Sequence, residues 1–176
     1  SAAPYGSVSM LPVTYGYLLM LGAEGLKYVT EMAILNANYL ASSFEKLGFK
    51  ILFKGKQGRV GHEMIWDCSA FNKEYGISEL DIAKRLMDFG FHAPTLSFPV
   101  HGTLMVEPTE SEPKEELDRF IEALKTIREE MCEVAEGKAD KTDNVLKNAP
   151  HTHKVLTADE WTHTYPRSKA AYPLPW

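Results

Sequence analysis

The sequence predicts an α/β domain in which helices pack on one side of a small, mostly antiparallel sheet, followed by an irregular tail. The first observation is the order of periodic segments between residues 50 and 136, which is β-β-α-β-α. The second is a long apolar repeat ahead of them, typical of a helix that faces a core. The third is the loss of periodicity after Gly137, where four prolines fall within residues 137–176.

A long helix is predicted over Leu26–Leu47. Its apolar residues recur at every third or fourth position, and Gly48 stands where a glycine commonly ends a helix. Ahead of it, Val13–Leu21 is almost entirely apolar or aromatic, which is typical of a buried helix. Gly22 and Gly25 interrupt the pattern between these two segments.

Two strands, Lys50–Phe53 and Val60–Phe71, are predicted on either side of a turn at Gly55–Gly58. A third, short strand is predicted at Thr103–Val106. Alternate residues of the second strand share a side, so one face carries His62, Met64, Trp66 and Cys68.

Two further helices begin at recognisable N-terminal signals. Ser78 with Asp81 resembles a capping box, and the helix that it begins is expected to reach about Phe89. Ser111 and Pro113 mark the second N-terminus. The apolar stripe of this last helix consists of Leu117, Phe120, Ile121, Leu124, Ile127 and Met131.

The composition excludes several classes of function. With 24 acidic against 19 basic residues, the net charge of −5 argues against a general nucleic-acid surface. No apolar run approaches the roughly 18 residues of a membrane span, so no membrane partner is expected. Residues 107–136 hold 11 acidic and 4 basic side chains, which we interpret as a solvated helix face, with a docking surface as the alternative. The two cysteines suit free thiols in a reducing compartment.

The tail over residues 137–176 contains aromatic side chains, which disordered segments usually lack. We expect it to wrap along a larger body, with its aromatic residues as anchors. Two histidines, His151 and His153, invite a metal interpretation, with His163 beyond them. Neither cysteine is near this pair, however, and no metal site is expected. The aromatic anchors are Trp161, Tyr165, Tyr172 and Trp176.

The segment His92–Ser111 fits no simple secondary-structure period. Its three prolines restrict the backbone at low entropic cost, which suits a rigid loop beside a binding site. His92 stands at the mouth of this loop, either as a structural histidine or as part of the lining of an active-site channel. Glu107 directly follows the predicted strand, and it either takes part in the chemistry or braces the next helix turn.

Six motifs extend over essentially the whole chain: SAAPYGS at 1–7, AILNANY at 33–39, VGHE at 60–63, FGFHAPT at 89–95, GTLMVEPTESE at 102–112 and AAYPLPW at 170–176. Together they resemble the C-terminal part of the glycine-cleavage P-protein family, the pyridoxal-phosphate-dependent glycine decarboxylases. The resemblance implies the C-terminal small domain of an aspartate-aminotransferase-like enzyme of fold type I. Residues 1–30 are then the end of the large-domain region and a linker, 31–136 the small α/β domain, and 137–176 an irregular extension.

The activity that the resemblance implies belongs to the whole enzyme. Such an enzyme releases CO2 from glycine and passes the aminomethyl group to the lipoyl arm of an H-protein, as a homodimer or a two-subunit heteromer. The family's cofactor lysine, in a His-Lys-Thr context before a glycine-rich loop, is expected upstream of Ser1. We therefore expect no pyridoxal phosphate on this fragment and no activity from it alone.

The alternative to a fragment of an enzyme is a stand-alone α/β binding or regulatory module. The expected location is the cytoplasm in bacteria and the mitochondrial matrix in eukaryotes.

The resemblance also implies a cofactor-binding segment near the start of the chain. In this fold class, small polar residues shortly after the glycine-rich loop meet the cofactor phosphate, and Ser1, Tyr5 and Ser7 occupy that place. Capping of the following helix by Ser7 is an equally good interpretation.

The implied catalytic candidates are Glu107 and His92, within a segment Phe91–Glu110 that we expect to form a wall of the substrate channel. Many relatives in this fold class clamp a substrate carboxylate with an arginine of the small domain. No arginine lies between His92 and Lys114. This absence suits a decarboxylase, because a tight clamp would stabilise the carboxylate in the ground state.

Overall fold

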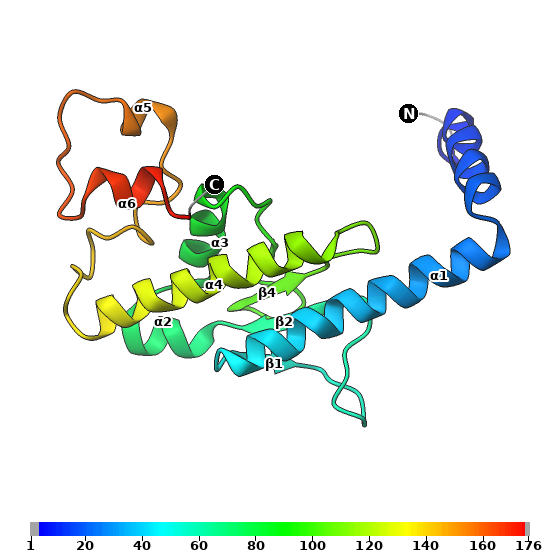
Figure 1. Cartoon of the computed structure of the whole chain (residues 1–176), viewed down its shortest axis with the longest axis horizontal. Coiled ribbons are helices and arrows are strands. Elements are labelled where there is room, and N and C mark those ends of the chain that lie inside the picture. Colours follow the sequence, from blue (N-terminus) through cyan, green and yellow to red (C-terminus); the bar gives the residue numbers. More distant parts are fainter. Residues whose placement is uncertain (1–3, 175–176) are drawn as a thin grey trace.

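The structure is a computed structural model that describes residues 4–174 (Figure 1). Between β1 and α4 the order of elements is β-β-α-α-β-β-α, which confirms an α/β domain and adds one helix and one strand to the predicted order. The helices are η1 (Val8–Met10), α1 (Leu11–Lys46), α2 (Ser69–Tyr75), α3 (Glu79–Asp88), α4 (Lys114–Ala135), α5 (His153–Leu156) and α6 (Arg167–Ala171). The strands are β1 (Lys50–Leu52), β2 (Met64–Asp67), β3 (Thr95–Leu96) and β4 (Thr103–Val106).

One four-stranded sheet has the order β1-β2-β4-β3, and every neighbouring pair is antiparallel. Trp66 of β2 pairs with Ile51 of β1 and with Leu104 of β4. All three belong to the main hydrophobic cluster, as Met64 does, whereas Ile65 lies outside it. The predicted alternation is therefore confirmed for Met64 and Trp66, whereas His62 is exposed and, like Cys68, lies outside the strand.

The predicted extent of that strand, Val60–Phe71, is wrong at both ends. The strand stops at Asp67, whose Oδ1 accepts hydrogen bonds from the backbone N–H and the hydroxyl of Ser69, at 3.0 and 2.6 Å. These bonds turn the chain into α2, a helix that the apolar alternation did not reveal. Gly76, at φ 70°, then ends α2.

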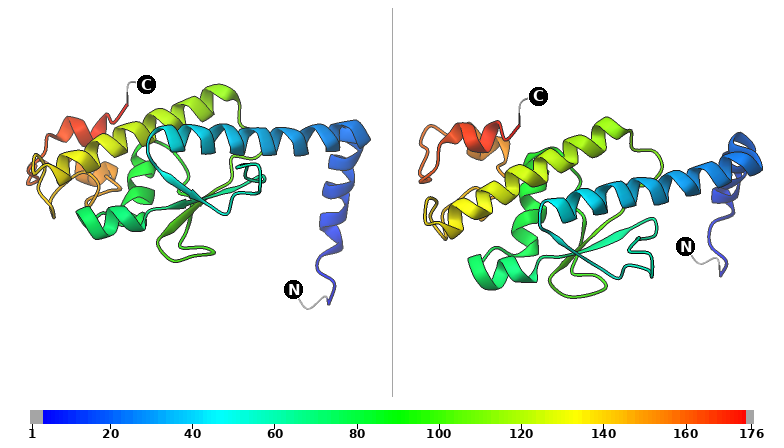
Figure 2. Two further views of the ribbon diagram at one scale, coloured as in Figure 1. Left: turned by 90° about the horizontal axis from the view of Figure 1, so that it is seen from below. Right: turned by 60° about the horizontal axis from the view of Figure 1, so that its bottom comes forward.

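The core lies between the sheet and one layer of helices. In Figure 2, α1 and α4 lie over the same face of the sheet. Phe44 of α1 contacts Trp66 edge to face at a centroid distance of 5.3 Å, and it contacts Phe120 of α4 at 6.0 Å. Burial of each such side chain stabilises the fold by about 1.5–3 kcal/mol. The prediction that helices cover one side of the sheet is confirmed.

The helix predicted at Leu26–Leu47 begins earlier, at Leu11, because two helical stretches join across Gly22. Gly22 has a φ of 61°, outside the helical range, and the chain bends there. The segment ahead of this bend projects away from the domain (Figure 2). In this chain the prediction that Val13–Leu21 is buried is wrong, since Met20 is 80% exposed and Val13 is 66% exposed.

The signals that begin α3 and α4 are confirmed. The Ser78 hydroxyl accepts from the Asp81 N–H at 3.3 Å, and the Ser78 N–H donates to the Asp81 carboxylate at 2.8 Å. This is a capping box. Gly90, at φ 77°, follows the end of α3, and Pro113 occupies the N-cap position of α4.

The tail closes over the ends of α3 and α4 through buried polar groups. Arg85, fully buried, donates two hydrogen bonds to Glu130 of α4 and one to Asp88. His151 in the tail donates its backbone N–H to Asp88 at 2.6 Å, and its Nδ1 lies 2.7 Å from the same carboxylate. Of the predicted anchors, Trp161 and Tyr165 pack around His151, Tyr172 is exposed, and Trp176 lies outside the described residues.

Among residues 4–174, no helix is long and apolar enough to cross a membrane. Within the same residues, no group of three or more His, Cys, Asp or Glu side chains is arranged to hold a metal ion. Cys68 and Cys132 are both free thiols, as expected.

Candidate functional site

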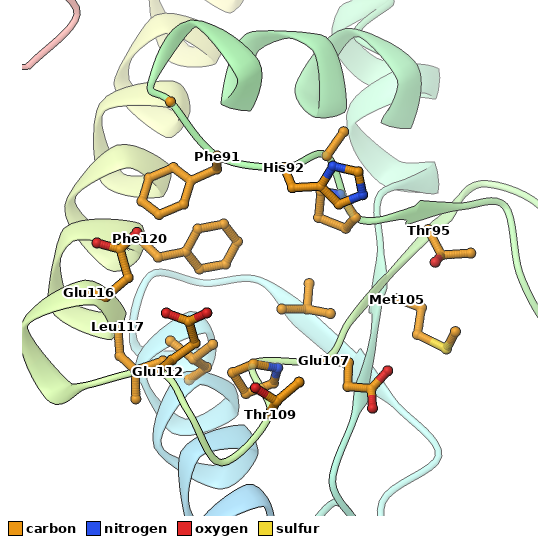
Figure 3. Close-up of a pocket in the computed structure, with 16 residues that line it drawn as sticks. Phe91, His92, Thr95, Met105, Glu107, Thr109, Glu112, Glu116, Leu117 and Phe120 are labelled. Atoms are coloured by element: carbon orange, nitrogen blue, oxygen red, sulfur yellow. The ribbon is translucent and has the colours of Figure 1, made fainter. Parts of the chain in front are cut away.

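A cleft of about 430 Å³ opens at the end of the domain where α4 begins (Figure 3). Three segments bound it: the chain after α3, the end of β4 with the loop that follows, and the first turns of α4. Its floor is apolar, with Leu40 of α1 beneath and Phe91, Leu117 and Phe120 beside it. Polar side chains at its edge are His92, Thr95, Glu107, Thr109, Glu112 and Glu116.

Local sequence explains why the chain opens here. Gly90 ends α3 in a left-handed conformation and sends Phe91 and His92 out along the cleft. Prolines on both sides, Pro94 and Pro108, restrict the backbone of the two walls. The prolines thus limit the backbone dihedral angles of the extended chain that forms the cleft wall, which favours a rigid surface.

The carboxylates of the cleft are not equivalent. Glu112 points inward from the loop before α4, whereas Glu107 lies on the β4 side (Figure 3). The Glu107 carboxylate is half exposed, and one of its oxygens is 4.0 Å from Nε2 of His62. The negative charge of Glu116 is balanced by Arg119, which donates hydrogen bonds to both carboxylate oxygens, at 2.9 and 2.6 Å.

Arg119 shapes the cleft without entering its lining. Its hydrogen bonds to Glu116 lower the pKa of that carboxyl, so Glu116 stays ionised and paired. The guanidinium also lies 3.9 Å from the Phe91 ring centroid and donates to the Phe89 carbonyl at 2.7 Å. Among the described residues that line the cleft there is no lysine or arginine. The open polar groups are therefore two carboxylates, two hydroxyls and one imidazole.

Both predicted catalytic candidates lie in this cleft. His92 is exposed on the segment after α3, and Glu107 is exposed at the end of β4. Half of the predicted channel wall, Phe91–Glu110, borders the same space, namely residues 91–95 and 105–109. The structure thus brings together residues 15 positions apart in the sequence, while their catalytic roles stay predictions.

Of the predicted cofactor-binding residues, Tyr5 and Ser7 do not line the cleft. Ser1 lies outside the described residues, and Tyr5 is fully exposed. Ser7 occupies the N-cap position of η1 without capping it, and its hydroxyl lies 2.7 Å from that of Ser9. The described part of this segment lies apart from the cleft, and its contact with a cofactor phosphate stays a prediction for the whole enzyme.

Two residues of the site were not predicted as functional. Glu112 belongs to the motif at 102–112, in which Glu107 is the predicted catalytic candidate. Asn36 stands on the apolar stripe of α1, between Ala33 and Leu40 at helical spacing. A polar residue on a core-facing stripe is the signal that could have identified it, because buried amides need hydrogen-bond partners.

An antiparallel four-stranded sheet, covered on one face by helices and ending in this cleft, defines the chain as a small α/β domain. The family described as "Glycine dehydrogenase, C-terminal domain" matches residues 29–151, a range that includes the whole cleft lining. The chain belongs to the glycine dehydrogenase (decarboxylating) family.

Individual relatives match almost the full chain. It is 59% identical over 174 residues to the glycine dehydrogenase (decarboxylating) of Bacteroides fragilis, and 58% identical over 174 residues to that of Bacteroides thetaiotaomicron. The protein of the same name from Nostoc punctiforme is 55% identical over 176 residues. These matches cover 99 to 100% of this chain and 18% of each relative. The chain therefore spans less than a fifth of the length of the curated relatives that it matches.

Proposed function

We propose that the chain is the C-terminal part of a pyridoxal-phosphate-dependent glycine decarboxylase. The whole enzyme releases CO2 from glycine and passes the aminomethyl group to the lipoyl arm of an H-protein. The position of the cleft carries this proposal. Its walls come mainly from segments 89–95 and 102–112, which are two of the motifs that resemble the family. In this proposal the cleft is one wall of the substrate channel, and the cofactor site belongs to the whole enzyme.

The chemistry of the lining suits a decarboxylase. The leucine and phenylalanine side chains of its floor offer an apolar surface to a bound substrate. The described lining offers no cation to a substrate carboxylate, so the ground state that must lose CO2 is not stabilised there. Glu107 and His92 are exposed ionisable groups of the lining that can hold or move a proton, and Glu112 is a third such group.

The first test concerns Glu107 in the full-length enzyme. We expect Glu107→Gln to lower kcat for glycine decarboxylation by roughly tenfold, equivalent to about 1.4 kcal/mol in the barrier. The KM for glycine should change less, because the carboxylate is proposed to act on the reaction and not on binding. Release of labelled CO2 from carboxyl-labelled glycine measures both constants.

Glu110→Gln is the matched control. Glu110 lies outside the cleft lining, and it accepts a hydrogen bond from the Tyr17 hydroxyl at 3.4 Å. If Glu107→Gln changes only the melting temperature, Glu107 is structural and its proposed role in the reaction is wrong.

The second test concerns the fragment itself. With pyridoxal phosphate and glycine added, we expect the 176-residue chain to develop no stoichiometric absorbance band near the visible edge and to release no CO2. A stoichiometric band accompanied by decarboxylation would contradict this expectation.

The third test concerns the predicted cofactor-binding residues. In the full-length enzyme, Ser1→Ala and Ser7→Ala should weaken cofactor affinity, and unchanged affinity in both would remove these residues from the proposal.

A stand-alone α/β binding or regulatory module is the second candidate, favoured by the complete hydrophobic core of the chain. The natural reading frame separates the two. An upstream His-Lys-Thr and a glycine-rich loop support the enzyme, whereas a start codon just before Ser1 supports the module.

For the enzyme we propose glycine and H-protein as partners, and a homodimer or a two-subunit heteromer as the assembly. Its location is the cytoplasm for a bacterial source and the mitochondrial matrix for a eukaryotic one.

A further inference from the structure

Asn36 is a buried amide that joins α1 to the loop before α4. Only 5% of the residue is exposed, although its side chain is polar. Its Nδ2 donates to the carbonyl oxygen of Thr109 at 2.9 Å and to that of Glu112 at 3.3 Å. The partners lie 73 and 76 positions further along the chain, so these bonds are a tertiary feature.

The loop that receives these bonds needs external support. Thr109 has a φ of 59°, a left-handed conformation that is unfavourable for a β-branched residue. Within the loop, the Thr109 hydroxyl contacts the Ser111 hydroxyl at 3.0 Å, an exposed and weak constraint. Asn36 therefore supplies partly buried hydrogen bonds at both ends of the segment 109–112.

The same loop carries polar groups of the cleft. Thr109 lines the cleft, and Glu112 points into it (Figure 3). Leu40, one helical turn after Asn36, forms part of the floor. The helix that floors the cleft thus also fixes the loop from which Glu112 projects.

Asn38 provides an internal comparison. Its Nδ2 donates to the Val60 carbonyl at 2.9 Å, and its Oδ1 accepts from the Val60 N–H at 3.0 Å. Val60 does not line the cleft. Two asparagines that are two residues apart on one helix therefore use the same chemistry to hold different loops.

We propose that Asn36 is a positioning residue of the cleft, which holds the Thr109–Glu112 loop so that the Glu112 carboxylate faces the bound substrate. Its effect on catalysis rests on the proposed function, whereas its effect on the loop rests on the hydrogen bonds alone. Asn36 acts through Glu112 and touches no substrate.

Hydrogen exchange of the 176-residue chain tests the effect on the loop. Asn36→Asp keeps the size of the side chain but removes both donors and places a carboxylate against two carbonyl oxygens. We expect the peptides that cover residues 107–112 to exchange about tenfold faster in this variant, with little change at residues 60–63. Asn38→Ala should show the reverse pattern. Equal acceleration of both loops by both variants would overturn the proposal.

Asn36→Ala is the second variant, which adds no charge. If Asn36→Asp does not fold, this variant should produce the same local pattern of exchange. Undisturbed exchange at residues 107–112 in Asn36→Ala would overturn the positioning role.

Kinetics of the full-length enzyme test the consequence for the reaction. We expect Asn36→Ala to lower kcat/KM for glycine by about tenfold and Asn38→Ala by less than about twofold, with similar loss of thermal stability in both.

Glu112→Gln distinguishes failure of the Asn36 proposal from failure of the proposed function. If it slows the enzyme while Asn36→Ala does not, the role of Asn36 is wrong and the proposed function stands. If Glu107→Gln and Glu112→Gln both leave kcat and KM unchanged, the cleft is not the channel, and the proposed effect of Asn36 on catalysis fails with it.

Discussion

At the scale of the residue, Asp143 illustrates how one carboxylate orders a stretch of tail that has little regular structure. Its Oδ1 accepts from the Asn148 amide at 2.7 Å and lies 2.8 Å from Nδ1 of His163, and its Oδ2 accepts from the Thr164 N–H at 2.7 Å. Partial burial acts to raise the pKa of Asp143, but these hydrogen bonds outweigh it and lower the pKa to about 2. The folded state therefore prefers the ionised carboxyl.

The depressed pKa predicts an acid-sensitive tail. The stabilisation from Asp143 is fully present above its unfolded pKa, near 3.8, and is lost as the pH falls through about 2. Asp143→Asn should lower the free energy of unfolding at pH 7 by about 1 to 2 kcal/mol, and the difference from the parent chain should shrink toward pH 2. Urea unfolding at several pH values measures it. Asp159→Asn, at an exposed position, is the control, and a pH-independent deficit would contradict the prediction.

At the scale of the element, α3 connects the tail to the cleft. Its N-terminus is held by the Ser78–Asp81 capping box, and Lys147 of the tail donates to the same Asp81 carboxylate at 2.6 Å. Its C-terminus carries Asp88, which binds His151, and the chain then enters the cleft wall at Gly90. A well-ordered α3 is therefore a condition for a well-ordered wall.

The capping box predicts the stability of this element. Ser78→Ala removes the acceptor for the Asp81 N–H, and we expect it to lower the free energy of unfolding by about 1 kcal/mol. Ser42→Ala is the matched control, because Ser42 is an exposed residue in the interior of α1. Denaturant midpoints measure both. Equal effects of the two substitutions would show that the cap contributes nothing to stability.

At the scale of the whole molecule, a buried ion cluster joins α3, α4 and the tail. Arg85 is fully buried and lies between Asp88 and Glu130, whose side chains are 4% and 3% exposed. Its Nη2 also donates to the Lys169 carbonyl at 3.1 Å. Burial is the larger influence on the pKa of Glu130 and raises it, while the hydrogen bond from Arg85 opposes the rise. The ion pair thus compensates a large desolvation cost.

Removal of the Glu130 charge should leave the buried Arg85 guanidinium with one carboxylate partner, Asp88, in place of two. We expect Glu130→Gln to lower the free energy of unfolding by about 3 kcal/mol, because removal of one partner of a buried pair is strongly destabilising. Glu129→Gln, one position earlier and exposed, should change stability by less than about 0.5 kcal/mol. Urea unfolding measures both variants. A change of similar size in the two would mean that the cluster is not a determinant of stability.

The elements predicted correctly from the sequence are those with local signals. The capping box at Ser78, Pro113 at the start of α4 and the strand Thr103–Val106 each depend on residues a few positions apart. Local backbone preferences and the period of apolar residues determine such elements before any tertiary contact forms. The prolines and family motifs of Phe91–Glu110 lie within one short stretch, and half of that stretch borders the cleft, while its role as a channel wall stays a prediction.

The sequence by itself thus determined the fold class, most helices and strands, and the family. Only the tertiary structure decided the pairing of β3 with β4, the partners of Asn36 and the contact between Arg85 and Glu130, which lie 45 positions apart. It also decided that Met20 is exposed here, since an apolar side chain is buried only where another surface covers it. Contacts between distant segments depend on how the chain closes its loops, and no local pattern of residues encodes that geometry.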